Sequence, residues 1–148
     1  TRGYGIYNHT YLDYRPVITN WNPGRRNGTL VSINQGPVTT YAIMQVEDRG
    51  EIFVDPGTEV YEGMIVGKNS RDNDISVNIT RAKAQTNVRS SNKDQTAQIK
   101  TPTHLTLEES LEFLNDDELV EVTPENVRLR KIILETNARE KAAKRRNG

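Results

Sequence analysis

Two polar stretches of this 148-residue chain, residues 68–74 and 80–96, combine basic side chains with amides and hydroxyls at close spacing. Lys and Arg neutralise phosphates, while amide and hydroxyl groups bond to sugar and phosphate oxygens. The pattern favours RNA binding, and its alternative is a pair of solvated loops. Neither stretch contains an aromatic residue, which disfavours a stacking platform for single-stranded bases. The candidate RNA-binding residues are Lys68, Arg71 and Asn73 in the first stretch, and Arg81, Lys83, Thr86, Asn87, Arg89 and Lys93 in the second.

Charge is sorted along the chain although its formal net value is zero. Residues 68–100 carry seven basic and three acidic side chains, and residues 128–148 carry eight and two. Residues 101–127 carry eight acidic side chains and no basic ones. Because phosphate partners respond to local charge, the two basic blocks indicate more about partners than the average does.

Other chemistry has weaker support in the sequence. There is no Cys and there are two His, which disfavours disulfides and thiolate or imidazole metal centres. The stretch from Gly63 to Lys68 lacks the spacing of a phosphate loop, and residues 72–83 lack the Gly and Glu of a calcium loop. Asp116-Asp117-Glu118 is interpreted as a solvated turn rather than a carboxylate pair for hydrolysis. We therefore expect no catalytic residue, no bound cofactor and no metal in this chain.

Composition and length limit the class of protein. The length fits one domain with a core of its own, and 34% of the residues are apolar and 27% charged. No apolar run reaches the roughly 18–20 residues that a membrane span needs, so no membrane partner is expected. The sequence begins with Thr1, and we interpret it as part of a longer protein.

The elements that would position the polar stretches are mainly strands. Short β-branched and aromatic runs separated by Gly, Pro and Asn turns predict strands, and residues 29–33 and 38–47 are expected to form a hairpin. An interior glycine, Gly63, predicts a bend within its strand. Between the strands and the helices, residues 80–96 are predicted to form a long polar loop. The predicted strands cover 3–14, 29–33, 38–47, 51–54, 59–66 and 75–79.

The last third of the chain predicts two helices around a hairpin. Thr106 and Glu109 have the spacing of a capping box, and Leu107, Leu111 and Leu114 share one face of the helix 106–115. Residues 119–122 and 127–133 are predicted to pair as a hairpin. A helix over 138–146 would be capped by Asn137. The expected fold is α+β and mainly β: a small, barrel-like body of antiparallel strands, a helix after residue 105, a hairpin and a C-terminal helix.

Several long motifs resemble those of one family. Residues 2–16, RGYGIYNHTYLDYRP, are similar to the end of a domain that resembles domain V of elongation factor G. The motifs at 24–36, 47–67, 70–78, 86–89 and 105–131 resemble the C-terminal domain of the TypA/BipA translational GTPases. The resemblance implies a last domain-V-like strand over 1–16 and a family-specific C-terminal domain over 17–148.

The resemblance also implies a function. The parent would bind GTP and Mg²⁺ in an N-terminal domain absent from this chain. It would associate with the 70S ribosome, assist assembly of the large (50S) subunit and adjust translation under stress. The family motif at 70–74 would add Ser70 and Asp74 to the RNA- and ribosome-binding residues. The loop 80–96 would reach ribosomal RNA and A-site tRNA, and the chain would be a cytoplasmic monomer. The alternative left open is a protein–protein adaptor that uses the acidic segment 108–125.

Overall fold

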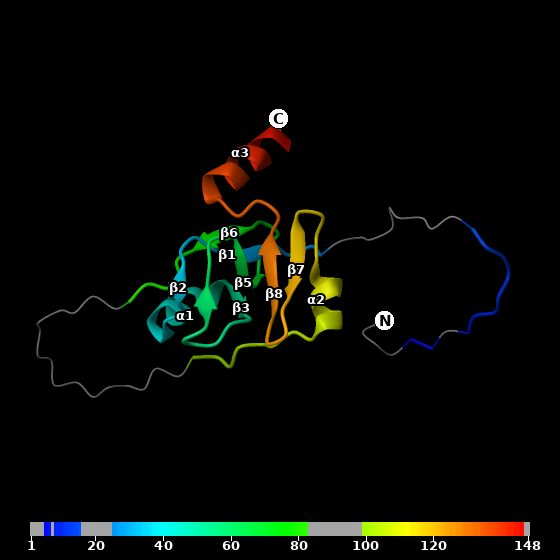
Figure 1. The fold of residues 1–148 in the computed structure, drawn as a ribbon, viewed down its shortest axis with the longest axis horizontal. Coiled ribbons are helices and arrows are strands. Elements are labelled where there is room, and N and C mark those ends of the chain that lie inside the picture. Colours follow the sequence, from blue (N-terminus) through cyan, green and yellow to red (C-terminus); the bar gives the residue numbers. More distant parts are fainter. Residues whose placement is uncertain (1–4, 7, 16–24, 83–98, 147–148) are drawn as a thin grey trace, which may run out of the picture.

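The computed structural model describes residues 5–6, 8–15, 25–82 and 99–146. Its body is a mixed sheet with a helix on each face and a third helix at the C-terminal end (Figure 1). The helices are α1 (Thr40–Val46), α2 (Leu107–Phe113) and α3 (Thr136–Arg146), with a 3₁₀ turn at Glu47–Arg49. The strands are β1 (Thr29–Ser32), β2 (Gly36–Pro37), β3 (Gly50–Ile52), β4 (Glu59–Val60), β5 (Met64–Asn69), β6 (Ile75–Val77), β7 (Glu118–Val122) and β8 (Val127–Lys131).

Strand β5 is the centre of the larger sheet, whose order is β6-β1-β5-β8-β7. Strand β1 pairs with β5 antiparallel, while β8 pairs with Met64 and Ile65 and β3 pairs with residues 67–69. Strands β2 and β4 form a separate two-stranded sheet. The α+β, mainly β class is confirmed. Over the described residues the strands do not close into a barrel, and β1 pairs with β6 in parallel rather than antiparallel.

The predicted hairpin of 29–33 with 38–47 is wrong, because the second segment is helix α1. Thr39 caps this helix: its hydroxyl accepts a hydrogen bond from the Ala42 amide at 3.1 Å. Ala42, Ile43 and Val46 then fall on one helical face and enter the core. The β-branched content of the segment suggested a strand, but burial along a helical period decides its structure.

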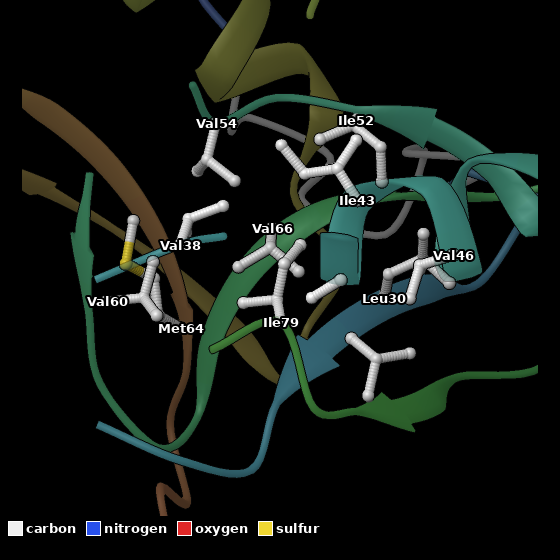
Figure 2. Packing of buried hydrophobic residues seen from close by; sticks show 12 residues of the cluster. Leu30, Val38, Ile43, Val46, Ile52, Val54, Val60, Met64, Val66 and Ile79 are labelled. Atoms are coloured by element: carbon white, nitrogen blue, oxygen red, sulfur yellow. The ribbon is translucent and has the colours of Figure 1, made fainter. Parts of the chain in front are cut away.

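Two apolar clusters fill the two faces of the larger sheet. Neighbouring residues of a strand point to opposite faces, so Val66 joins the cluster under α1 while Ile65 joins the cluster under α2. Figure 2 shows Ile43 of α1 lying beside Val66 and Ile52. The body is therefore held on both sides, and the loops between its strands are presented from a fixed frame.

Gly63 separates β4 from β5, so the strand predicted over 59–66 is two strands. Its φ is 87°, and an added Cβ would lie 2.6 Å from the Leu134 Cα. Both the positive φ and the close approach require glycine here. The bend predicted from this residue is confirmed, and it aligns β5 with β8.

The predicted capping box of α2 is confirmed by hydrogen bonds in both directions between Thr106 and Glu109. The predicted common apolar face is not buried, since Leu107 and Leu111 are exposed. The hairpin β7–β8 is confirmed. Helix α3 begins one residue before Asn137, at Thr136, so the predicted Asn137 cap is wrong.

The predicted first strand is not formed. The described residues 5–6 and 8–15 lie outside every strand, and Ile6, Tyr11, Leu12 and Tyr14 are exposed. A strand at this point needs a partner edge, and no other described residue pairs with it. The boundary between a domain ending at residue 16 and one beginning at 17 stays a prediction.

Candidate nucleic-acid interface

The loop 70–74 joins β5 to β6 and is fixed by backbone hydrogen bonds to two other segments. The Gly28 amide donates to the Arg71 carbonyl at 2.8 Å, and the Asn69 amide donates to the Gly28 carbonyl at 2.9 Å. The Ser70 amide donates to the Arg49 carbonyl at 2.9 Å, and the Ser70 hydroxyl reaches the same carbonyl at 2.8 Å. The backbone of Arg71 is therefore held in place by the body.

Two asparagines complete the support of this loop. Asn69 is 2% exposed, and its side chain donates to the Asn73 carbonyl and accepts from the Arg71 amide. The Asn27 side chain donates to the carbonyls of Asn69 and Ser70, each at 3.1 Å. Buried amides that satisfy turn carbonyls replace the regular pairing of a strand, so the loop keeps one conformation.

Asp74 fixes the end of the loop. Its carboxylate accepts from the Thr29 amide at 2.8 Å and hydroxyl at 2.9 Å, and its other oxygen lies 2.6 Å from Lys131 Nζ. Burial alone would raise the pKa of Asp74, but the charge and hydrogen bonds of Lys131 and Thr29 outweigh it and hold that pKa below its usual range. In this position Asp74 orients the loop, while the neighbouring side chains remain available to a partner.

Three arginines surround the loop with their side chains in solvent, and we call them the exposed arginines: Arg26, Arg49 and Arg71. Within the described part of the chain, their guanidinium groups make no hydrogen bond or ion pair. Arg49 and Arg71 line a hollow of about 270 Å³ together with Asp48, Ser70 and Ile75. The arrangement can bind an anion from several sides without first breaking an internal contact.

Lys68 lies on a neighbouring, more mixed surface. It lines a second hollow of about 550 Å³ with Lys100 and with the acidic side chains of Glu47, Asp48 and Glu51. Because acids share this hollow, its potential is less positive than that around Arg71. The structure therefore places Ser70, Arg71, Asn73 and Asp74 in the β5–β6 connection and Lys68 in β5 just before it, with Arg71 as the exposed cation of the group.

The second predicted stretch is placed only at its ends. The Thr39 hydroxyl donates to the Arg81 carbonyl at 2.6 Å, and the Lys100 amide donates to Glu47 Oε2 at 3.0 Å. Thr39 caps the start of α1 and Glu47 follows its end, so α1 lies between the two entry points. Five candidate residues lie outside the described ones: Lys83, Thr86, Asn87, Arg89 and Lys93.

A buried ion network lies behind the loop, and the sequence did not indicate it. Its buried members are Arg25, Glu118 and Lys131, and the exposed or half-buried carboxylates of Asp74 and Asp117 complete it at 2.6 and 3.1 Å from Lys131 Nζ. Arg25 donates to both carboxylate oxygens of Glu118, at 2.8 and 2.9 Å, and its guanidinium carbon lies 3.9 Å from the centre of the Phe113 ring. Lys131 Nζ lies 2.8 Å from the same Glu118 carboxylate. The side chains of Glu118 and Lys131 are 0% and 3% exposed.

The network keeps its groups charged. Burial would raise the pKa of Glu118, but hydrogen bonds from Arg25 and Lys131 outweigh it and lower that pKa. Burial would lower the pKa of Lys131, but Asp74 and Glu118 outweigh it and raise that pKa. The expectation that residues 116–118 form a solvated turn is wrong for Glu118, which links the loop 70–74 through Lys131 to α2 through Arg25.

Three observations bear on other kinds of site in the part of the chain that the structure describes. Among the described residues no group of three or more His, Cys, Asp or Glu is placed to hold a metal ion. None of the described helices is long and apolar enough to cross a bilayer. The stretch from Gly63 to Lys68 forms strand β5 and the turn before it, not a phosphate loop.

A family profile described as the TypA/BipA C-terminal domain matches residues 27–136. The chain belongs to this family. The TypA/BipA C-terminal domain includes every described element from β1 to β8 together with the exposed arginines Arg49 and Arg71. The match confirms the resemblance carried by the sequence motifs.

Similar full-length proteins extend the comparison. The chain is 60% identical over 146 residues to the large ribosomal subunit assembly factor BipA of Bacillus subtilis, covering 99% of this chain and 24% of that protein. It is 46% identical over 145 residues to the protein of that name from Synechocystis, covering 98% and 23%. Against the Escherichia coli K12 protein of the same name it is 43% identical over 142 residues, covering 96% and 23%. The chain spans about a quarter of the length of the curated relatives it matches.

Proposed function

We propose that this chain is the ribosome-binding C-terminal module of a large-subunit assembly factor, and that it contacts ribosomal RNA through the surface around the loop 70–74. The observation that carries the proposal is the pairing of a fixed loop backbone with unpaired exposed arginines. The relatives are named large ribosomal subunit assembly factors, which points to the large ribosomal subunit as the partner.

The mechanism is positional. A backbone that is already ordered loses little conformational entropy on binding, so phosphate contacts made by Arg71 are not offset by ordering of its loop. Each neutralised phosphate releases counterions, which makes the affinity depend on salt. Ser70 and Asn73 would add hydrogen bonds to sugar or phosphate oxygens beside that charge.

The second stretch would extend the contact to A-site tRNA. The sequence of 83–98 brings Lys83, Arg89 and Lys93, and its two ends leave the body on either side of α1. A basic, polar segment carried from two fixed points can follow the shape of a folded RNA. Contact with A-site tRNA and action on the 70S ribosome are therefore part of the proposal, as are roles in 50S assembly and stress adaptation.

No catalytic step is assigned to this chain. GTP and Mg²⁺ would bind in the N-terminal part of the parent protein, outside the sequence studied. The chain would act on that chemistry by fixing where the parent sits on the ribosome.

The test measures salt-dependent binding of the chain to purified large ribosomal subunits. We expect the variant Arg49→Gln/Arg71→Gln to bind more weakly, with the slope of log affinity against log salt reduced by about one to two. The matched control, Gln35→Glu/Asn126→Asp, changes net charge equally at exposed positions outside this surface. Equal slopes for the wild type and the arginine variant would overturn the assignment of this surface.

A separate variant tests the second stretch. Lys83, Arg89 and Lys93 are replaced by Gln, and cross-linking to A-site tRNA is measured on 70S ribosomes. We expect the tRNA cross-link to be lost while the thermal unfolding of the body is unchanged. Retention of the cross-link at wild-type yield would remove tRNA from the proposal.

The adaptor alternative uses the acidic segment 108–125. Several acidic side chains of this segment already make internal contacts and are not free to bind a partner. Glu109 closes the capping box of α2, Glu118 belongs to the buried ion network, and Glu121 accepts from the Tyr61 hydroxyl at 2.6 Å. Of the exposed acids that remain, Asp116 and Glu125 lie in turns, and Glu108 and Glu112 lie on α2. The adaptor alternative predicts that neutralising Glu108 and Glu112 abolishes ribosome binding. If RNA contact is the main interaction, ribosome binding stays intact.

A further inference from the structure

Helix α3 carries a stripe of cations that nothing in the body neutralises. Lys141, Lys144 and Arg145 are exposed, and within the described residues they make no hydrogen bond or ion pair. Their spacing of three and four residues places them on one face of the helix, with neighbouring Cβ atoms about 5–6 Å apart. We call these three residues the α3 stripe.

Packing does not account for this helix. Its sequence, TNAREKAAKRR, contains no apolar side chain larger than alanine, and only Ala138 and Ala142 among its alanines are partly buried. A helix that is polar all round and about 16 Å long is marginal in water on its own. An element of this kind is retained where something outside the body contributes to its stability.

The start of α3 is nevertheless fixed firmly. The Thr136 amide and hydroxyl donate to Glu62 Oε1 at 2.7 and 2.8 Å. The Arg139 guanidinium donates to the Ile133 carbonyl at 3.2 Å, to the Leu134 carbonyl and to the Thr136 hydroxyl at 3.0 Å. These contacts aim the helix, so the α3 stripe projects in a defined direction.

The helix dipole explains only part of the stripe. Cations in the last turn of a helix complement the partial negative charge of its C-terminal carbonyls, by about 0.3–1 kcal/mol each. Lys144 and Arg145 lie in that turn. Lys141 lies one turn earlier, where the effect has decayed, and a side chain that complements the dipole remains free to bind an anion as well.

Helix α3 borders the same part of the sheet as the exposed arginines Arg49 and Arg71. Ala142 and Ala143 of α3 line a groove of about 620 Å³ with Ile75 and Ser76 of β6. Ile75 also borders the hollow that Arg49 and Arg71 line. Figure 1 shows α3 standing over the β6 side of the body. The groove is also lined by carboxylates, at Asp74, Asp116, Asp117 and Glu140. The stripe residues are not among its lining, and their positions on the helix place them on the opposite face of α3, toward solvent.

We infer that the α3 stripe binds the phosphate backbone of ribosomal RNA as a second contact beside the exposed arginines. An acidic protein is a weaker fit, because protein interfaces centre on buried aromatic or apolar anchors and the stripe offers none. Phosphate contacts need only charge and reach. This inference rests on the proposed function and adds a residue set that the loop 70–74 does not include.

The test uses the 148-residue chain with protein-free large-subunit RNA as the probe, and measures affinity over a range of salt. Gln is a good helix former, so the stripe variant keeps helix propensity while losing three charges. We expect its log–log salt slope to fall by about two to three. The stripe variant is Lys141→Gln/Lys144→Gln/Arg145→Gln, and its matched control is Gln35→Glu/Gln45→Glu/Asn126→Asp.

The outcomes separate this inference from the proposed function. A lower slope for the stripe variant, with the control unchanged, supports the inference. An unchanged slope for the stripe variant together with a lower slope for Arg49→Gln/Arg71→Gln overturns the inference and leaves the proposed function standing. Unchanged RNA binding with reduced cross-linking to an acidic protein of the subunit also overturns it. Circular dichroism measures whether the stripe variant keeps the helical content of α3. If helicity is lost, the single variant Lys141→Gln replaces the stripe variant. For Lys141→Gln we expect the log–log salt slope to fall by less than one.

Discussion

Arg25 and Arg26 are adjacent in the sequence but differ in burial and in the contacts of their side chains. The Arg25 side chain is 7% exposed and donates to Glu118, to the Phe113 carbonyl and to the Asn27 carbonyl. Arg26 is exposed and makes no hydrogen bond or ion pair with the described residues. One arginine holds the body together, and the other is available to a partner.

The same division between buried, paired charges and exposed, unpaired charges holds across the described residues. The buried ion network uses charges to connect β8, β7 and α2 with the loop 70–74, and its members are satisfied internally. The exposed arginines and the α3 stripe are presented by that frame and are left unpaired within it. Charge alone therefore does not distinguish the two groups of cations. Internal pairing does, and the proposed RNA contacts are the cations that lack an internal partner among the described residues.

The largest expected effect comes from breaking the network at its centre. Glu118→Gln leaves Arg25 buried without a carboxylate partner, while Lys131 keeps Asp74 and Asp117. Breaking a buried pair in this way typically costs about 3–5 kcal/mol. The free energy of unfolding, measured with urea, should fall by that amount. Glu125→Gln, at an exposed turn, is the control and should change it by less than about 0.5 kcal/mol.

The second prediction compares the two neighbouring arginines directly. Arg25→Gln removes charged hydrogen bonds to Glu118 and should lower the free energy of unfolding by about 2–3 kcal/mol. Arg26→Gln should leave stability within about 0.5 kcal/mol and weaken binding to large ribosomal subunits instead. Equal stability losses from both substitutions would remove the distinction between buried and exposed cations.

The smallest predicted effect is a pH dependence. The pKa values of Asp74 and Glu118 are lowered in the folded state, so the unfolded chain takes up protons first as the solution is acidified. The stabilisation from these carboxylates is complete above their unfolded pKa values, about 4, and is lost as pH falls through the lower folded values. Urea unfolding across acidic pH should show a shallower decline for Glu118→Gln than for the wild type.

Local signals in the sequence predicted much of the fold. Short patterns with a single physical interpretation predicted three features: the capping box of Thr106 and Glu109, the hairpin β7–β8 and the bend at Gly63. The strand prediction for residues 38–47 failed because their β-branched side chains favour a strand, whereas the burial of the segment follows a helical period. Strand pairing across long separations, such as β1 with β6, depends on the assembled core and has no local signal.

The sequence proposed the loop 70–74 as a site, and its role in binding RNA stays a prediction. Local charge and amides identified the loop 70–74, yet Arg26 and Arg49 join it only because Asn27 and the Arg49 carbonyl bind that loop. One signal was available for the network: Lys131 continues the alternation of Val127 and Leu129, which places a charge at an inward position of β8. A charge at such a position needs a buried partner, and Glu118 is that partner.

The most direct test is to cross-link the chain to large ribosomal subunits and to map which residues are joined to RNA. We predict that RNA cross-links fall at the exposed arginines, Arg26, Arg49 and Arg71, and that Arg25 and Lys131 acquire none. Cross-links confined to the face of α2, with the surface around Arg71 unmodified, would contradict the account.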